Sequence, residues 1–319
     1  MRWLERPIVR WGLLLITFAW IAWALADQWQ AMRLAATDLR IAWRWVIAGS
    51  IMVLTTYAVL IQSWRMLLRG MGSELSYGAA VRIWTIANLG RWIPGKVWSV
   101  GALGVLAARE GVSGTAAAGA ALLGTVLNIG AGFGISVVTG ARGLDAVRPG
   151  LSLTATWLAV LFVIGVATLP WMLPPTIRRL GRWRGTASAS MEQVTALPAV
   201  TVWAATFINA AAWVGYGVAF AFFARGVTPG ISGDPSMFIA VFTTSYLIGY
   251  LALFAPGGLG IREYALVALL IAFGVAGNGE AVILSATSRV WLTVLEVVPG
   301  IISLFWLPPS QRAALRQSG

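Results

Sequence analysis

The stretch NLGRWIPGKVW, residues 88–98, interrupts an otherwise apolar region with two cations, Arg91 and Lys96, around a Pro94–Gly95 pair. Lys96 is the only lysine in the chain. Proline removes a backbone donor and clashes with the preceding turn, while glycine tolerates the bend that results. The stretch therefore predicts a break inside residues 77–110, which leaves two apolar arms that are each too short to cross a bilayer comfortably.

A second region, residues 237–274, is broken in the same manner at APGGLG, residues 255–260. Two short helices joined at such a break can enter a membrane and leave it on the same side. We therefore interpret both regions as re-entrant helical hairpins, with a pair of tightly kinked full spans as the alternative.

The composition indicates the class of protein that surrounds these hairpins. Of the 319 residues, 59% are hydrophobic and 11% are charged, whereas a soluble domain carries about 25% charged residues. Several apolar runs reach the roughly 20 residues that cross a bilayer as a helix. The sequence predicts an all-α polytopic membrane protein, with residues 1–319 as a single integral membrane domain. Besides the two hairpins we expect six full spans, near residues 10–26, 41–63, 115–138, 151–172, 199–224 and 281–306.

Basic residues predict how these spans are oriented. With the N-terminus in the cytoplasm, the basic loop at 174–198 and the C-terminal tail also lie inside, in agreement with the positive-inside rule. Such loops explain the formal charge of +12, so we expect no nucleic-acid partner. Three full spans separate the hairpins, which must then enter from opposite faces. The first span, near 10–26, is interpreted as a retained signal anchor, with a cleaved signal peptide as the alternative.

The two hairpins also resemble each other in sequence. PGKVWSVGALGVLAAREGVSG runs from Pro94 to Gly114, and PGGLGIREYALVALLIAFGVAG runs from Pro256 to Gly277. Each begins with Pro-Gly, continues as an apolar helical arm, and ends in a Gly-Val-small-Gly motif. Because the hairpins enter from opposite faces, this similarity predicts an inverted-topology repeat, as in many transporters. A chance match between glycine-rich segments is the alternative.

Cations gather where the two helices after the breaks begin. The first N–H groups of a helix lack partners and its dipole is positive there, so a helix N-terminus suits an anion. Arg91 and Lys96 flank the first break, Arg262 follows the second, and Asn88 lies one turn before Arg91. If the two tips meet, these groups form a phosphate site; the alternative is that Arg91 and Lys96 extend to the membrane surface. The expected hinge residues at the tips are Pro94, Gly95, Pro256, Gly257, Gly258 and Gly260.

Further charges follow the second break. Arg289 and Glu296 lie seven residues apart, on one face of the last span, and Glu263 follows Arg262. A charge at bilayer depth costs about 3 kcal/mol, so it should face a partner or water. Either Arg289–Glu296 or Glu263–Arg289 could form a structural ion pair, or Glu263 or Glu296 could couple transport to a proton gradient. Both interpretations stay open.

The sequence is poorly equipped for enzyme chemistry. It contains no cysteine and no histidine, which excludes thiolate chemistry, the commonest general base and most zinc ligation. It has no Walker loop and no carboxylate cluster with metal-ligand spacing. We therefore expect no catalytic residues, no metal and no cofactor.

The two motifs resemble those of a known family. NLGRWIPGKVW followed by AAREG, and APGGLGIREYAL followed by ATSRVW and VVPG, resemble the transmembrane region of lysylphosphatidylglycerol synthases and of stand-alone flippase-like proteins, over residues 10–306. The resemblance implies a bacterial or archaeal cytoplasmic (inner) membrane protein that moves a lipid between leaflets. It does not extend to the soluble synthase domain of bifunctional members, so aminoacyl transfer is not expected. By position, the family's motif residues are Asn88, Arg91, Pro94, Gly95, Lys96, Pro256, Gly257, Gly258, Gly260, Arg262, Glu263 and Arg289.

Together these features predict a lipid transporter of the flippase or scramblase type. The substrate would be an anionic phospholipid or a polyprenyl-phosphate-linked lipid, with its phosphate held in a cationic cavity between the hairpins. The expected substrate-binding residues are Asn88, Arg91, Lys96, Arg262 and Arg289. The alternatives are a non-transporting lipid-binding subunit of a lipid or glycan biosynthesis complex, and a small-solute or ion transporter. A homo-oligomer or a biosynthetic enzyme as partner stays open.

Overall fold

A computed structural model describes residues 41–92, 97–147, 149–184, 197–252 and 256–306. These residues form helices and turns, with no strand among them. The elements are α2 (Trp43–Gly70), α3 (Tyr77–Asn88), the 3₁₀ turn η2 (Leu89–Trp92), α4 (Val97–Arg109), α5 (Gly114–Val147), α6 (Leu151–Arg184), α8 (Ala199–Val227), α9 (Pro235–Leu251), the 3₁₀ turn η3 (Pro256–Gly258), α10 (Ile261–Ala272) and α11 (Asn278–Phe305).

The prediction of a polytopic α-helical membrane protein is confirmed. Among the described residues, four helices are long and apolar enough to cross a membrane: Trp43–Gly70, Gly114–Ala141, Ala199–Val227 and Asn278–Phe305. These correspond to four of the six expected spans. The expected span at 151–172 lies in α6, whose apolar part, Leu151–Gly165, is shorter than those four. The expected span at 10–26 lies outside the described residues.

Two helices extend further than the sequence suggested. Residues 174–184, expected in a basic loop, are helical and form the end of α6. Residues 139–147, expected to connect two spans, continue α5. The arginines of these segments favour helix, whereas Pro174 and Pro175, inside α6, disfavour it. Apolar periodicity therefore marks where a span ends, but it does not mark where the helix ends.

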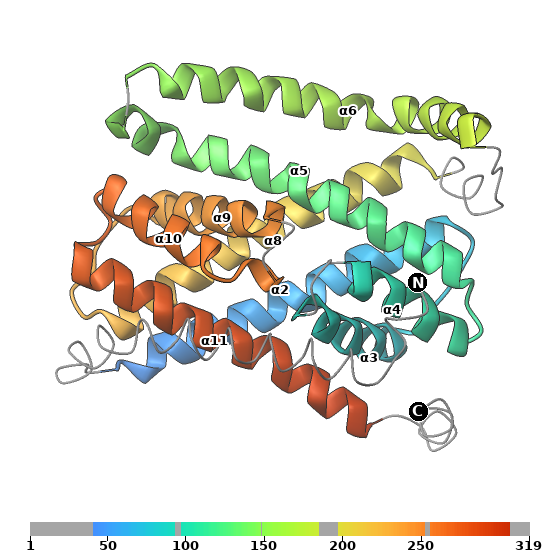
Figure 1. The fold of residues 1–319 in the computed structure, drawn as a ribbon, viewed down its shortest axis with the longest axis horizontal. Helices are drawn as coiled ribbons and strands as arrows, with labels where there is room; N and C mark the ends of the chain where they lie inside the picture. Colours follow the sequence, from blue (N-terminus) through green and yellow to red (C-terminus); the bar gives the residue numbers. More distant parts are fainter. Residues whose placement is uncertain (1–40, 93–96, 148, 185–196, 253–255, 307–319) are drawn as a thin grey trace.

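Each of the two broken regions is a pair of shorter helices, as expected. The helices α3 and α4 contact each other, as do α9 and α10, and the turns η2 and η3 contact one another in the middle of the molecule (Figure 1). Ser76 caps α3 through the Ala79 N–H, and Asp234 caps α9 through the Ser236 N–H. The expected tip residues at 93–96, together with residues 253–255, lie outside the described residues.

The contacts between the described helices follow a similar pattern in two halves of the chain. The first half holds α2, the α3–α4 pair and α5, and the second holds α8, the α9–α10 pair and α11. The helix that follows each pair contacts the first helix of the other pair, since α5 packs on α9 and α11 packs on α3. In addition, α2 packs on α8, its own equivalent. This reciprocal pattern is what an internal two-fold repeat produces.

Glycines allow the central α2–α8 pair to approach closely. A Cβ atom at Gly49 of α2 would lie 2.8 Å from the Ala219 carbonyl oxygen of α8, and one at Gly226 of α8 would lie 2.7 Å from a Val46 methyl. Small residues serve this purpose in membrane helices, where close packing replaces the hydrophobic effect as the driving force.

We predict that Gly49→Ala destabilises the protein by about 1–3 kcal/mol, because the new methyl group overpacks the α2–α8 contact. The matched control is Gly165→Ala on α6, where an added Cβ meets no atom within 4 Å. It should be neutral or slightly stabilising, since alanine is the better helix former. Thermal unfolding of both variants in detergent tests this, and equal unfolding temperatures would contradict the close packing.

Candidate functional site

Three arginines from three separate elements meet where η2 and η3 touch. Arg91 comes from η2, Arg262 from α10 and Arg289 from α11, and all three line a cavity of about 10 Å³. That volume is close to what a single water molecule needs. The residues that line the cavity are Arg91, Tyr246, Gly257, Arg262, Arg289, Leu292, Thr293 and Glu296.

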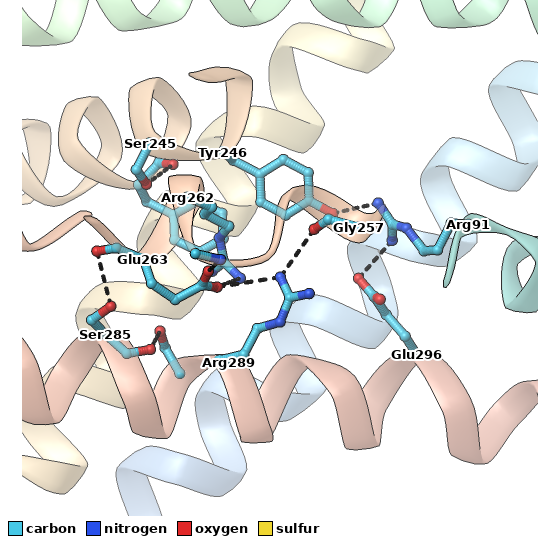
Figure 2. A network of polar contacts seen from close by, with 12 residues as sticks. Arg91, Ser245, Tyr246, Gly257, Arg262, Glu263, Ser285, Arg289 and Glu296 are labelled. Atoms are coloured by element: carbon cyan, nitrogen blue, oxygen red, sulfur yellow. Dashed lines mark hydrogen bonds and ion pairs between the residues drawn. The ribbon is translucent and has the colours of Figure 1, made fainter. Parts of the chain in front are cut away.

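Arg91 joins the first hairpin to both helices that face it. Its Nη1 donates a hydrogen bond of 2.6 Å to Glu296 Oε1 of α11. Its Nη2 donates to the hydroxyl of Tyr246 on α9, also at 2.6 Å (Figure 2). The Glu296 side chain is only 9% exposed, so this ion pair is largely shielded from water. Charge-assisted bonds of this kind are about twice as strong as neutral ones.

Arg289 binds the tip and the start of the second hairpin. Its Nη1 lies 3.3 Å from Glu263 Oε1 and donates a 3.1 Å hydrogen bond to the Gly257 carbonyl oxygen (Figure 2). Glu263 in turn accepts the Gly260 N–H at 2.7 Å, which caps α10. This is one of the two pairings expected for Arg289; Glu296, the other candidate, binds Arg91 instead.

Arg262 has the longest ion-pair contact of the three arginines, because its Nη1 lies 4.0 Å from Glu263 Oε1. The residue is 3% exposed, and its Nε and Nη2 have no hydrogen-bond partner within the described part of the chain. Its guanidinium carbon lies 5.4 Å from the centre of the Phe242 ring and 5.1 Å from that of Tyr246, so cation–π attraction replaces part of the missing solvation. A buried donor left without a partner typically costs 1–3 kcal/mol, and more when it is charged.

Glycines bring the Arg262 backbone against α9. A Cβ atom at Gly249 would lie 2.6 Å from Arg262 Cβ, and one at Gly258 would lie 2.6 Å from the Gly249 carbonyl oxygen. Gly258 also has φ of +70°, with Gly257 at +56° and Gly260 at +79°. Glycine adopts this left-handed region without steric cost. Residues 256–260 thus form a tight turn that needs glycine at positions 257, 258 and 260, and this turn sets the position of Arg262.

The charges of the site leave a positive excess. Three arginines face two carboxylates, those of Glu263 and Glu296, among the described residues of the cluster. Arginine presents a planar set of donors that matches the oxygens of a phosphate or carboxylate. In the same part of the chain, no group of three or more His, Cys, Asp or Glu side chains could hold a metal ion. The cluster is therefore chemically suited to an anion.

The structure brings together most of the residues singled out from the sequence. Arg91, Arg262, Arg289 and Glu296 line the same cavity with Gly257. Glu263 pairs with Arg289 beside it, and Gly258 and Gly260 complete the tip. Asn88 ends α3 and is not among the cavity-lining residues, while Pro256 begins η3. Lys96, Pro94 and Gly95 lie outside the described residues.

Sequence reasoning missed Tyr246 and the Phe242 ring beside it. Both lie in the apolar arm of the second hairpin, where an aromatic residue is ordinary and suggests packing alone. The available signal was the Tyr246 hydroxyl, because a buried phenol usually finds a hydrogen-bond partner.

A comparison with protein-family models found one match. The model described as "Lysylphosphatidylglycerol synthase TM region" matches residues 9–300, which confirms the resemblance based on the two Pro-Gly motifs. A search among curated proteins found no match.

We predict that Arg91 and Glu296 are strongly coupled. Removing one partner of a buried pair leaves an uncompensated charge and costs about 3–5 kcal/mol, whereas replacing both by apolar residues is far less costly. A double-mutant cycle with Arg91→Leu and Glu296→Leu should therefore give a coupling energy of about 2–3 kcal/mol in detergent unfolding.

The matched control for this cycle is the Arg69–Glu74 pair. Its 2.9 Å contact joins side chains that are 60% and 73% exposed, so its coupling should stay below about 1 kcal/mol. Equal coupling in the two cycles would show that Glu296 is not a buried counter-ion.

Proposed function

We propose that this chain, which belongs to the lysylphosphatidylglycerol synthase transmembrane-region family, is a lipid transporter of the flippase or scramblase type. The substrate headgroup carries a phosphate, as in an anionic phospholipid or a polyprenyl-phosphate-linked lipid. The phosphate binds between the two hairpin tips while the hydrocarbon chains stay in the bilayer.

The observation that carries this proposal is Arg262. Two of its buried nitrogens, Nε and Nη2, have no hydrogen-bond partner among the described residues, and its contact with Glu263 Oε1 is 4.0 Å long. Such unsatisfied donors are costly, and this cost is offset when an anionic ligand accepts their N–H groups. The positive excess of the cluster supports the same conclusion, because two carboxylates cannot neutralise three arginines. A phosphate supplies both the missing acceptors and the missing negative charge.

The small cavity requires that the tips separate for a headgroup to bind. A volume of about 10 Å³ admits about one water molecule, so the arrangement described here is an occluded one. We propose that the carboxylates act as counter-ions in this state. Glu296 holds Arg91, Glu263 holds Arg289, and an arriving phosphate competes with them for the arginines.

The two hairpins, in this proposal, are re-entrant and enter from opposite faces of the cytoplasmic membrane, with both termini in the cytoplasm. The reciprocal helix contacts of the two halves support an internal repeat, and inverted repeats place substrate sites at the interface of the halves. Opening one hairpin at a time would then expose the arginines to one leaflet and afterwards to the other.

We predict that the positions just after the two hairpins lie on opposite sides of the membrane. Thr115 and Gly279 are exposed near the starts of α5 and α11, and the chain has no cysteine of its own. A membrane-impermeant maleimide added to spheroplasts should label Gly279→Cys, and it should label Thr115→Cys only after permeabilisation. Labelling of both from the same side would overturn the inverted arrangement.

We also predict that lipid movement depends on Arg262 and on headgroup charge. In vesicles with the purified protein, Arg262→Ala should slow the movement of labelled phosphatidylglycerol at least about tenfold, the equivalent of 1.4 kcal/mol. Arg69→Ala, which removes an exposed arginine, should leave the rate unchanged. A lipid with the same chains and a zwitterionic headgroup should move more slowly than phosphatidylglycerol, because the site has an excess positive charge.

Two results would contradict the transporter proposal. One is lipid movement no faster than in protein-free vesicles, which would favour a non-transporting lipid-binding subunit. The other is a rate in Arg262→Ala that equals the parent's while thermal unfolding shows an intact fold. The same assay with an imposed pH gradient tests the role of Glu263 and Glu296. If they couple transport to protons, the rate of lipid movement follows the gradient; if they form structural ion pairs, it does not.

A further inference from the structure

A second, larger cavity lies along the seam between α3 and α11. It has a volume of about 430 Å³, within the range of about 300–1,000 Å³ typical of ligand sites. We call it the α3–α11 groove. Its walls are mainly apolar, and a hydrogen bond of 2.9 Å between the Thr85 and Ser303 hydroxyls crosses the seam. The residues that line it are Gly78, Val81, Arg82, Thr85, Pro299, Ile302, Ser303 and Trp306.

Among the described residues, the corresponding seam in the other half of the chain has no such groove, so the groove does not follow from the helix arrangement alone. The equivalent seam in the other half lies between α9 and α5. Pro94 and Pro256 are 162 positions apart, so the four α3 positions that line the groove correspond to Ala240, Thr243, Thr244 and Leu247 on α9. Ala240, Thr243 and Leu247 are buried, at 0%, 0% and 3% exposure, and Thr244 is half-buried.

The α5 side of the equivalent seam is filled as well. Gly114 and Gly277 are 163 positions apart, so Ser303 and Trp306 of the groove correspond to Gly140 and Gly143. A Cβ atom at Gly140 would lie 3.3 Å from Ala240 Cβ, and one at Gly143 would lie 2.6 Å from the Phe273 ring. One seam is thus closed by an aromatic side chain packed onto glycine, while its equivalent is open.

The groove and the arginine cavity lie along one face of α11. Leu292 and Glu296 line the cavity, and Pro299, Ser303 and Trp306 line the groove. The spacing of these residues, four and three in alternation, keeps them on one helix face. Seven residues separate Glu296 from Ser303, which is about 10 Å along the helix axis.

Leu89 separates the two spaces. A Cβ atom at Gly300 would lie 2.8 Å from a Leu89 methyl and 3.0 Å from the Thr85 carbonyl oxygen. The side chain of Leu89 therefore fills the seam between the groove and the cavity. Leu89 belongs to η2, the same short turn that carries Arg91, so a movement of this tip shifts the apolar barrier and the phosphate-binding arginine together.

We propose that the α3–α11 groove binds one hydrocarbon chain of the lipid whose phosphate binds the arginine cavity, and that Leu89 is the barrier between the two subsites. This inference rests on the proposed function and adds the route by which the lipid reaches the site. Continuity with the arginine cavity identifies the occupant, because a phosphate joined to a long apolar chain matches the two spaces in order. A helix, about 10 Å across with its side chains, would fill the groove but would bring no anion to the cavity.

Photo-crosslinking tests the groove directly. The full-length protein is reconstituted in phosphatidylcholine vesicles that contain phosphatidylglycerol with a diazirine in one acyl chain, and the adducts are located by mass spectrometry. Adducts should concentrate on the groove-lining parts of α3 and α11. The equivalent α5–α9 seam should carry few, because its side chains are packed.

Two glycine variants make the test specific. Gly78 lines the groove and Gly101 lies on α4, and an added Cβ meets no atom within 4 Å at either position. Gly78→Phe fills the groove and should lower the α3 and α11 adducts at least about fivefold by steric exclusion. Gly101→Phe, with the same change of size, should not. If Gly78→Phe does not fold, Gly78→Leu fills part of the space and serves in its place.

The outcomes separate this inference from the transporter proposal. Arg262→Ala should lose lipid movement and keep its groove adducts. The groove proposal alone is overturned if lipid movement depends on Arg262 but the adducts are spread evenly over all exposed helices. It is also overturned if both glycine variants reduce the adducts equally. If Gly78→Phe removes the groove adducts and Gly101→Phe does not, the groove binds a lipid chain, even if lipid movement proves independent of Arg262. A crosslink from a photoreactive residue at Gly78 to residues 10–26 instead of to lipid overturns it.

Discussion

Three arginines in an apolar helical bundle impose the constraint on which the rest of the structure depends. A charge at membrane depth must be paired, hydrated or bound to a ligand, since its insertion alone costs about 3 kcal/mol. Glu296 and Tyr246 satisfy Arg91, and Glu263 and the Gly257 carbonyl bind Arg289. Arg262, stacked near two aromatic rings, has donors that the described residues do not satisfy. Arg262 is thus the least compensated cation of the cluster, since its ion-pair contact with Glu263 Oε1 is 4.0 Å long.

Glycines allow the backbone segments around this cluster to pack closely against each other. The Arg262 backbone lies against Gly249, and Gly258 lies against the same residue. Gly49 brings α2 onto α8 in the same way. The tip of the second pair carries glycine at positions 257, 258 and 260, which lets this tip lie close to α9.

Much of this architecture can be predicted from the sequence, for physical reasons that are specific to each element. The four long apolar helices follow from the thickness of the bilayer, and the two helix pairs follow from Pro-Gly breaks in apolar runs too short to span. Arg91, Arg262 and Arg289 could be singled out because charge is rare in such a chain. Of their pairings, Glu263–Arg289 was one of two alternatives that the sequence offered. The Arg91–Glu296 pair could not be predicted, since these residues are 205 positions apart and only tertiary contact joins them.

Other features gave at most a weak signal in the sequence. Tyr246 resembles an ordinary core aromatic until Arg91 is placed beside it. The helices α5 and α6 continue past their apolar runs, and α6 does so through Pro174 and Pro175, which in a sequence favour a helix end. The difference between the open α3–α11 groove and the closed α5–α9 seam depends on how Phe273 packs against Gly143. The two halves have similar motifs, so the sequence predicts that both seams are open or that both are closed.

The central claim is that a phosphate group occupies the space beside Arg262. The most direct measurement is an experimental structure of the protein in nanodiscs of phosphatidylglycerol, at a resolution that shows phosphate groups. We expect density for a lipid phosphate within hydrogen-bond distance of the Arg262 guanidinium, with the η2 and η3 tips further apart than in the occluded arrangement. Lipid phosphates found only at the two membrane surfaces, with protein groups or water satisfying Arg262, would contradict the account.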